Sequence, residues 1–331
     1  MYSMQNGKHS ANIKDVAALA HVSTATVSRF LNGNFNRMSE ATADRVRVAI
    51  DKLKYVPNSA ARQMTTKSSN LIALIVANTD DYFSTELFKG VSSILESNGY
   101  IGTMLDSDSD FQREKKLIGA VNSHTFDGLI IQPFSSIATI SNIMRREAPI
   151  VIVDRETPQA PWPQVVTNNF DAAREATAYF VEHKFTHFIV LTSDLSAAIN
   201  RRERYRGILA ASSNVDVLEV SESSYNHKDI HEQLIKLLTK SKERTVIFAL
   251  KERWLLEFIP NLVLQGYIDN VKVTATGFAD TAMSRRLEPK LKLISQNPFL
   301  LGASAAEVMV KSLTDDDIQT DDVIVVPAKF G

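Results

Sequence analysis

A ten-residue stretch near the N-terminus carries side chains that could read a DNA sequence. Arg29 could donate two hydrogen bonds to a guanine, and Ala25 could contact a thymine methyl group. Thr24 could make either a hydrogen bond to a base or an apolar contact with a thymine methyl group. Other polar side chains of the stretch could bind phosphate groups, which positions a protein on the duplex without specifying the sequence. The residues expected to make these backbone contacts are Ser23, Thr26, Ser28 and Asn32.

Such side chains must be presented by a helix that fits the major groove. Apolar residues at helical spacing predict helices over residues 13–20 and 24–31, with Ser23 as the N-cap of the second, and a third helix after Ser39. The side chains expected to face inward are Val16, Leu19, Ala20, Val27, Phe30, Leu31, Val46, Ala49, Ile50 and Leu53. Two short helices joined by a three-residue turn form a helix-turn-helix, whose second helix enters the groove. Spacing alone also permits an ordinary three-helix head.

The charge of the chain is divided unevenly along its length. The formal net charge is only −1, but residues 1–67 contain ten basic and four acidic side chains. That segment therefore carries +6, and the remaining 264 residues carry −7. A basic head on an acidic body favours a polyanion as the partner of the head, although a solvated basic surface would carry the same charge.

Length and composition exclude several classes of protein. The 331 residues are 44% hydrophobic and 23% charged, which is typical of an ordinary globular protein, here of about two domains. The absence of cysteine excludes disulfides, thiolate metal sites and thiol catalysis. No long apolar run and no secretory signal is found, so we expect a cytoplasmic protein without a membrane partner. Walker A, GxGxxG and GxSxG motifs are also absent, and we expect no cofactor, no metal site and no enzymatic activity.

The residues of the head resemble those of a known family of regulators. Residues 13–33, IKDVAALAHVSTATVSRFLNG, are similar to the N-terminal domain of the lactose-repressor (LacI/GalR) family. The resemblance implies a helix-turn-helix DNA-binding domain over residues 12–57. We expect residues 1–11 before it to be disordered. His21 stands where the family has a glycine with positive φ, a conformation that histidine tolerates better than most residues.

A second segment, residues 55–64, YVPNSAARQM, resembles the hinge of the same family. The resemblance implies a hinge helix and linker over residues 58–69, which folds on the operator and pushes an apolar side chain into the minor groove. Its implied DNA contacts are Asn58, Ala61, Arg62 and Met64. Met64 replaces the usual leucine wedge, and methionine is also able to insert between base steps. Residues 58–68 could instead be a simple linker.

The rest of the chain alternates between strand-length apolar runs and helix-length amphipathic segments, which predicts parallel sheets covered on both faces. The expected strands lie near residues 71–77, 100–105, 127–132, 150–153, 187–192, 245–249, 272–276 and 292–295. The family resemblance continues here, for example in Phe126-Asp127-Gly128 and Val153-Asp154-Arg155. It implies an α/β body like a periplasmic binding protein, with two doubly wound subdomains joined by three crossings. The expected ranges are 70–166 with 298–322 for the N-subdomain, and 167–297 with 323–331 for the C-subdomain.

The resemblance also implies a small-molecule effector in the cleft between the subdomains. The residues at family ligand positions are Asp80, Tyr82, Phe83, Gln132, Asp154, Arg204, Phe278 and Gln296. Lys251 stands where sugar-binding relatives have an amide or a carboxylate, so together with Arg204 it favours an anionic effector, a sugar acid or a sugar phosphate. Lys251 could instead face solvent at the start of a helix, and Asp154 could form a structural pair with Arg155.

These features predict a sequence-specific transcriptional regulator, a repressor of carbohydrate metabolism genes. We expect a homodimer that binds a pseudo-palindromic operator of double-stranded DNA under the control of an effector. Two alternatives stay open within this class. One is a catabolite-control regulator that uses a protein corepressor, and the other is a repressor that responds to a neutral sugar. A solute-binding protein or enzyme built on the same body is disfavoured by the basic head.

Overall fold

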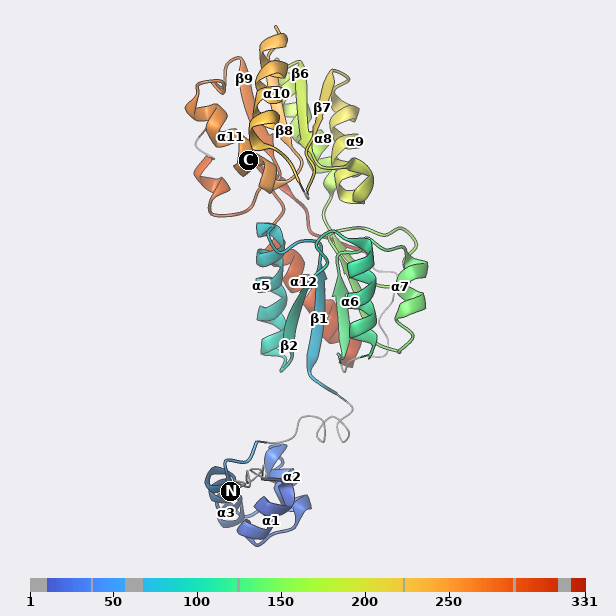
Figure 1. The fold of residues 1–331 in the computed structure, drawn as a ribbon, viewed down its shortest axis with the longest axis vertical. Coiled ribbons are helices and arrows are strands. Elements are labelled where there is room, and N and C mark those ends of the chain that lie inside the picture. Colours follow the sequence, from blue (N-terminus) through green and yellow to red (C-terminus); the bar gives the residue numbers. More distant parts are fainter. Residues whose placement is uncertain are drawn as a thin grey trace, which may run out of the picture. The chain divides into compact units, whose positions relative to one another are not determined.

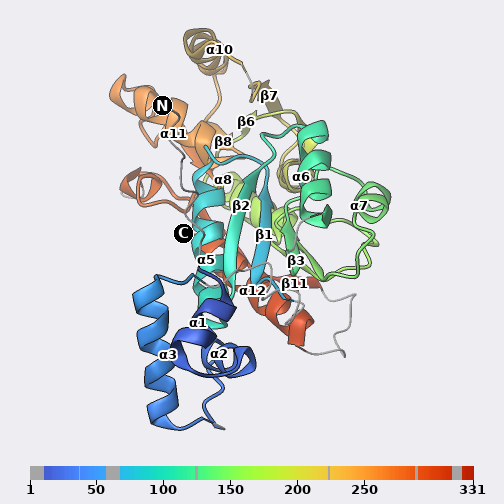
Figure 2. The ribbon, with the colours of Figure 1, turned by 60° about the horizontal axis from the view of Figure 1, so that its bottom comes forward.

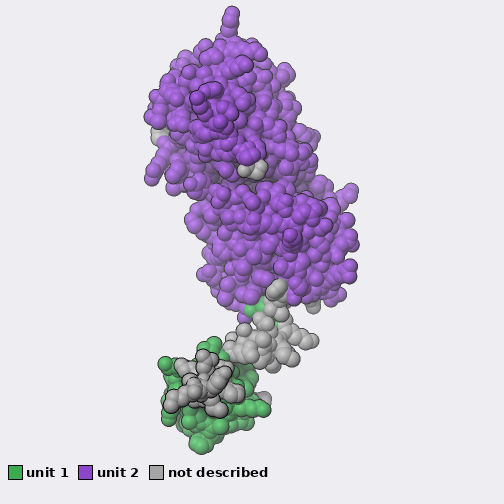
Figure 3. Space-filling view, viewed as in Figure 1, with its two compact units in different colours: residues 1–69 green, residues 70–331 purple. Residues whose placement is uncertain are grey.

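The computed structural model describes residues 11–36, 38–56, 68–123, 126–222, 224–287, 290–314 and 323–331. The chain divides into two compact units, residues 1–69 and residues 70–331, which we call the head and the body (Figure 3). The segment expected to be disordered lies outside the described residues except for Ala11, and so does the hinge over residues 58–67. No helix within the described ranges is long and apolar enough to cross a membrane.

Three helices form the head at the positions that the sequence predicts. They are α1 (Ile13–Ala20), α2 (Thr24–Leu31) and α3 (Glu40–Leu53). Ser23 and Ser39 cap α2 and α3 by accepting hydrogen bonds from main-chain amides three residues further on. The first helix ends at His21, which has a φ of 52° and so adopts the left-handed conformation expected at this turn.

A small apolar core joins the three helices. Its buried side chains are Val16, Ala17, Ala20, Val27, Val46 and Ala49. The partly buried side chains around it are Ile13, Val22, Phe30, Leu31, Ile50, Leu53 and Tyr55. The prediction for Leu19 was wrong, because this side chain is 39% exposed. The buried stripe of the two-turn helix α1 runs through Val16, Ala17 and Ala20 and leaves Leu19 at its margin.

The first half of the body, which we call the N-subdomain, is built on a six-stranded parallel sheet in the order β11-β5-β4-β3-β1-β2. Its strands are β1 (Leu71–Val76), β2 (Ile101–Asp106), β3 (Gly128–Ile131), β4 (Ile150–Val153), β5 (Gln164–Val166) and β11 (Val323–Val325). Helices cover both faces, with α5 and α12 on one and α6 and α7 on the other (Figures 1 and 2). Their bounds are α5 (Tyr82–Ser97), α6 (Phe111–Ser123), α7 (Ile137–Ile143) and α12 (Pro298–Thr314).

Helices α5 and α12 cross at two glycines. A Cβ atom on Gly90 would overlap the carbonyl oxygen of Phe299, and one on Gly302 would overlap the carbonyl oxygen of Leu87. The absence of side chains at both positions therefore lets the two backbones touch. This contact packs the first and last helices of the N-subdomain against each other, although they are far apart in the sequence.

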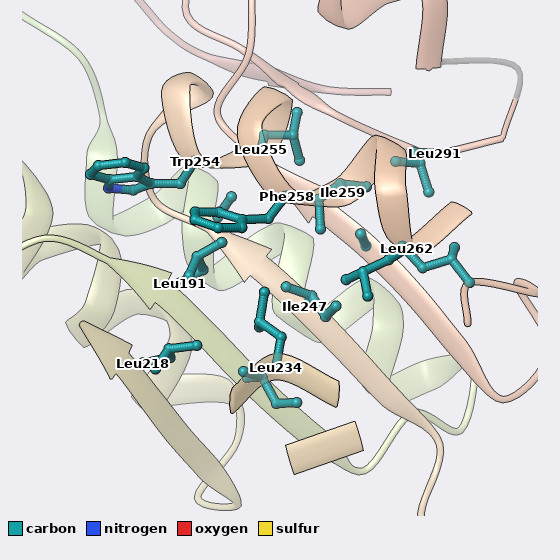
Figure 4. Close-up of a cluster of buried hydrophobic side chains, with 14 of the residues drawn as sticks. Leu191, Leu218, Leu234, Ile247, Trp254, Leu255, Phe258, Ile259, Leu262 and Leu291 are labelled. Atoms are coloured by element: carbon teal, nitrogen blue, oxygen red, sulfur yellow. The ribbon is translucent and has the colours of Figure 1, made fainter. Parts of the chain in front are cut away.

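The second half, which we call the C-subdomain, is built on a four-stranded parallel sheet in the order β7-β6-β8-β9. Its strands are β6 (His187–Thr192), β7 (Val215–Glu219), β8 (Thr245–Ala249) and β9 (Val273–Gly277). Its helices are α8 (Asn169–Glu182), α9 (Ile199–Ala211), α10 (His227–Lys240) and α11 (Glu252–Leu264), with short turns η1 (Leu195–Ala197) and η2 (Ser284–Leu287). Figure 4 shows Trp254, Phe258 and Leu262 of α11 packed with Leu191 and Ile247 of the sheet.

The chain crosses between the subdomains three times, after β5, after β10 (Ile294–Ser295) and after β11. Strand β12 (Lys329–Phe330) pairs antiparallel with β10 and packs with the C-subdomain. The doubly wound body is thus confirmed, but the expected boundary after residue 322 was wrong. Strand β11 pairs with β5 and completes the sheet of the N-subdomain, so the last crossing follows this strand.

Candidate functional site

The exposed surface of α2 carries the side chains proposed to read bases. Thr24, Ala25 and Arg29 are all exposed, and no hydrogen bond or ion pair joins the guanidinium of Arg29 to a described residue. Asn32 is also exposed, at the C-terminal cap of the helix. These groups are therefore available to a ligand. Ser28 is half-buried.

The first turn of α2 is held by its own side chains. Ser23 Oγ accepts a hydrogen bond from the Thr26 amide at 3.2 Å and lies 3.0 Å from Thr26 Oγ1. Both hydroxyls thus have a structural role in the cap, and any phosphate contact would use their remaining hydrogen-bonding capacity. The other proposed DNA contacts, Asn58, Ala61, Arg62 and Met64, lie outside the described residues.

A cavity lies in the body where strand ends of both sheets meet. Its walls include Gln132 directly after β3, Asp154 directly after β4 and Phe278 directly after β9. Ligands of parallel α/β sheets bind at this carboxyl edge of the strands. Seven of the nine residues assigned to the effector line the cavity, namely Phe83, Gln132, Asp154, Arg204, Lys251, Phe278 and Gln296.

The other two assigned residues do not line this cavity. Asp80 lines an adjoining outer cavity, which shares Asn78 and Arg201 with the first. Tyr82 lines neither cavity and is 47% exposed. Since α5 begins at Tyr82, the helical turn directs Phe83 and Ser84 into the cavity and Tyr82 away from it.

One wall of the cavity is a hydrogen-bonded group around Asp154, which joins residues of both subdomains. Asp154 Oδ2 accepts hydrogen bonds from Gln132 Nε2 at 2.9 Å and from Asn200 Nδ2 at 3.0 Å. The amide oxygen of Gln132 in turn accepts from the main chain of Ala77. Asp154 Oδ1 is buried and accepts no hydrogen bond from the described residues. The carboxylate is therefore oriented by its neighbours and keeps one acceptor open.

Arg155 is buried in the same wall without hydrogen-bond partners for two of its nitrogens. Its side-chain Nε and Nη1 make no hydrogen bond to described residues, and its guanidinium lies 3.9 Å from the ring centre of Phe134. Burial, followed by the nearby charge of Arg201, lowers the pKa of Arg155 to about 10. A buried guanidinium with open donors favours an anionic oxygen as its partner.

The C-subdomain contributes Arg204, which stacks on Phe278 with 3.8 Å between the guanidinium carbon and the ring centre. Its Nε donates to Asn169 Oδ1 at 2.7 Å and its Nη1 donates to the carbonyl oxygen of Leu250. Burial lowers the pKa of Arg204 to about 10, although neighbouring carboxylates, first Asp154, oppose this effect.

Polar groups near the end of the C-subdomain complete the wall. Asp280 Oδ1 accepts hydrogen bonds from Ser295 Oγ and from the amides of Gln296 and Asn297. Burial nevertheless raises the pKa of Asp280, since desolvation outweighs these bonds. Gln296 Nε2 is buried without an acceptor among the described residues.

Lys251 is neither solvent-facing nor a free cation in the cavity. Its Nζ lies 3.3 Å from Asp81 Oδ2 and 3.3 Å from Glu222 Oε2, and its side chain is 14% exposed. Glu222 also contacts Arg201 Nη2 at 2.7 Å. Desolvation would raise the pKa of Glu222, but Lys251 and then Arg201 outweigh it and hold this pKa at about 2. The expectation that Lys251 makes the cavity more positive was therefore wrong, because two carboxylates already neutralise it.

Nine further residues line the cavity, namely Ala77, Asn78, Asp81, Ser84, Arg155, Asn200, Arg201, Glu252 and Asp280. Several are sequence neighbours of assigned residues, such as Asp81 beside Asp80 and Glu252 beside Lys251, so including the positions next to each assigned residue would have found those. Asn200 precedes Arg204 by one helical turn, which is the corresponding signal on α9.

Comparisons with known proteins agree with this architecture. Residues 12–58 match bacterial regulatory proteins of the lacI family, and residues 72–317 match the periplasmic binding protein domain. The crystal structure of a LacI transcriptional regulator from Lactobacillus brevis is 57% identical to the chain, with a TM-score of 0.76, and the match covers 79% of this chain and 100% of that one. The chain belongs to the LacI family.

Similarity to other proteins of the LacI family extends over the head and the body. The transcriptional regulator KdgR of Bacillus subtilis is 24% identical over 310 residues, which cover 92% of this chain and 91% of KdgR. The structure of a lac repressor dimer bound to operator has the same fold, with a TM-score of 0.82 at 19% identity. The match covers 97% of this chain and 98% of the lac repressor chain. As a LacI-family member, the protein is a DNA-binding transcriptional regulator with a body of the effector-binding type.

Proposed function

We propose that this protein is a homodimeric repressor of carbohydrate metabolism genes, controlled by an anionic, hydroxylated effector such as a sugar acid or sugar phosphate. One observation carries the effector part of the proposal. Four buried polar atoms of the cavity lining have no partner among the described residues: Asp154 Oδ1, Arg155 Nε, Arg155 Nη1 and Gln296 Nε2. Because unsatisfied buried polar groups are costly, a cavity that gathers them is suited to a ligand that satisfies them.

The chemistry of these atoms indicates the functional groups of the ligand. The two donors of Arg155 suit a carboxylate or phosphate oxygen, and the amide donor of Gln296 suits a hydroxyl or carbonyl oxygen. The open oxygen of Asp154 can only accept, so it requires a donor such as a hydroxyl group. A ligand with both an anionic group and hydroxyl groups fulfils all three requirements.

For the DNA part, the support is the exposed face of α2 and the family of the head. Arg29, Ala25 and Thr24 are exposed on α2, which supports a role for them in contacting base edges in the major groove. A related fold is described as a lac repressor dimer bound to operator, and we extend that assembly to this chain. Two heads would then read two half-sites of a pseudo-palindrome, with Asn58, Ala61, Arg62 and Met64 in the hinge between them.

The effector proposal is tested by thermal unfolding of the full-length protein with gluconate, gluconate 6-phosphate, glucose and ribose. A ligand that binds only the folded state at 100 times its Kd stabilises it by about 2.7 kcal/mol. We expect stabilisation by members of the anionic group, and loss of it in Arg155→Gln but not in Arg174→Gln, an exposed arginine on α8 that pairs with Asp171.

Stabilisation by the neutral sugars alone would overturn the anionic effector. The absence of any stabilisation across a wider panel of sugar acids and sugar phosphates would favour a protein corepressor instead. In either case a gel-shift assay with operator fragments, run with and without each ligand, tests the DNA part separately.

A further inference from the structure

Lys251 forms an ion pair that joins the two subdomains at the cavity. Lys251 belongs to the C-subdomain, whereas Asp81 belongs to the N-subdomain, and their charged atoms are 3.3 Å apart. Among the described residues, this is the salt bridge that links the two subdomains. The other polar contacts between them at this place are Asn200 with Asp154 and Ser109 with Glu222.

Both partners of the pair are held in position by their own subdomain. Asp81 is the N-cap of α5, and its Oδ1 accepts a hydrogen bond from the Phe83 amide at 3.1 Å while Oδ2 meets Lys251. Lys251 stands at the N-terminal end of α11, and Glu222 contacts its Nζ from the side of the C-subdomain. Glu222 is itself fixed by Arg201. The lysine thus bridges a carboxylate from each subdomain.

This bridge is less exposed to water than an ordinary surface ion pair. The exposed fractions are 14% for Lys251, 18% for Asp81 and 14% for Glu222, so water and salt screen the charges little. The same arrangement makes Lys251 a poor partner for a bound anion, because an ammonium between two carboxylates presents no excess positive charge. Opening the subdomains would separate Lys251 from Asp81 and leave the Asp81 carboxylate unpaired.

We propose that Lys251 is a positioning residue that holds the two subdomains closed on each other before any effector binds. The inference rests on the proposed function only in taking this cavity as the effector site. A ligand that prefers the closed form then finds it already populated, and its apparent affinity is correspondingly higher. Lys251 would thus tune the response to effector through the closed form of the body.

The test measures closure in the full-length protein without any ligand. Because the chain has no cysteine, Gln112→Cys on α6 and Gln233→Cys on α10 introduce one spin label into each subdomain. Chains that carry both cysteines are co-expressed with an excess of the cysteine-free chain and spin-labelled after purification, so that distances within one chain dominate in pulsed electron spin resonance. The distance distribution is then compared between the parent protein, Lys251→Met and Asp81→Asn.

We expect one short-distance population in the parent protein. Both variants should raise the ratio of open to closed forms at least tenfold, which corresponds to about 1.4 kcal/mol. Lys251→Arg should retain the closed distribution, because its guanidinium can still meet both carboxylates. Lys228→Met is the matched control, since Lys228 is an exposed lysine on α10 that pairs with Glu232.

An unchanged distribution in Lys251→Met would overturn the proposal, and so would a shift in Lys251→Met without one in Asp81→Asn. If Lys251→Met fails to fold, the distance distributions of Asp81→Asn and Lys251→Arg test the proposal instead. The result is independent of the effector panel, because closure is measured without ligand. Failure of the effector proposal and failure of this inference are therefore distinguishable.

Discussion

Replacing Arg155 by methionine should stabilise the protein without effector. A pKa lowered from 12.5 to about 10 corresponds to about 3 kcal/mol against the charged form of this buried arginine. The sign follows from linkage, because a base whose pKa is lowered on folding destabilises the folded state at every pH below that pKa. At neutral pH the cost is therefore fully present, and Arg155→Met removes it.

The variant also loses the contact between the guanidinium and Phe134, which is worth up to about 2 kcal/mol when desolvated. The net expectation is a gain of about 1 kcal/mol, or about 2–4 °C in the unfolding temperature of the body. Thermal and urea unfolding of the full-length protein measure this, with Arg174→Met as a control that should change stability by less than about 0.5 kcal/mol. A loss of more than 1 kcal/mol in Arg155→Met would show that its neighbours already satisfy the guanidinium, and would remove the basis for assigning it to an anion.

Three further predictions concern the head, the hinge and the N-subdomain. Arg29→Ala should weaken binding to a specific operator by about 1–3 kcal/mol and binding to random DNA only a little, whereas Lys52→Ala should weaken both similarly. Equal losses of affinity for Arg29→Ala on both DNAs in gel-shift titrations would refute base reading. Met64→Gly should weaken operator binding and leave the thermal shift by effector unchanged, and unaltered operator affinity would exclude the wedge role. Gly302→Ala should destabilise the protein by about 1–3 kcal/mol in urea unfolding, because the added Cβ meets the backbone of α5. Gly119→Ala on α6 is the control and should be neutral or stabilising, because only Ile143 lies near its added Cβ. Equal changes in stability for the two variants would contradict the close crossing of α5 and α12.

Elements with strong local patterns were predictable from the sequence. The helices of the head coincide with the predicted ranges, since capping serines and apolar spacing act within a few residues. The long buried strands, such as β1 and β6, also lie where apolar runs predict them. The positive φ at His21 is also as expected, in this case from the glycine that the family has at this turn.

Short and partly exposed strands were missed. Strands β5 and β11 have three residues each and β12 has two, so none provides a periodic pattern long enough to identify it. Strand β7 does alternate at Val215 and Val217, but it lies at the edge of its sheet and most of its residues are only partly buried or exposed. Pairing with distant strands stabilises these segments, and that information is not local.

Some features of the cavity were likewise predictable from the sequence, and others depend on contacts between distant residues. Family positions at strand ends were sufficient to place Gln132, Asp154 and Phe278 in the lining, because parallel strands bring their carboxyl ends to one edge. The sequence could not show that Lys251 is neutralised by Asp81, 170 positions earlier, or that Arg155 retains open donors. The charge available to a ligand depends on which side chains meet across the subdomains, and only the tertiary structure decides that.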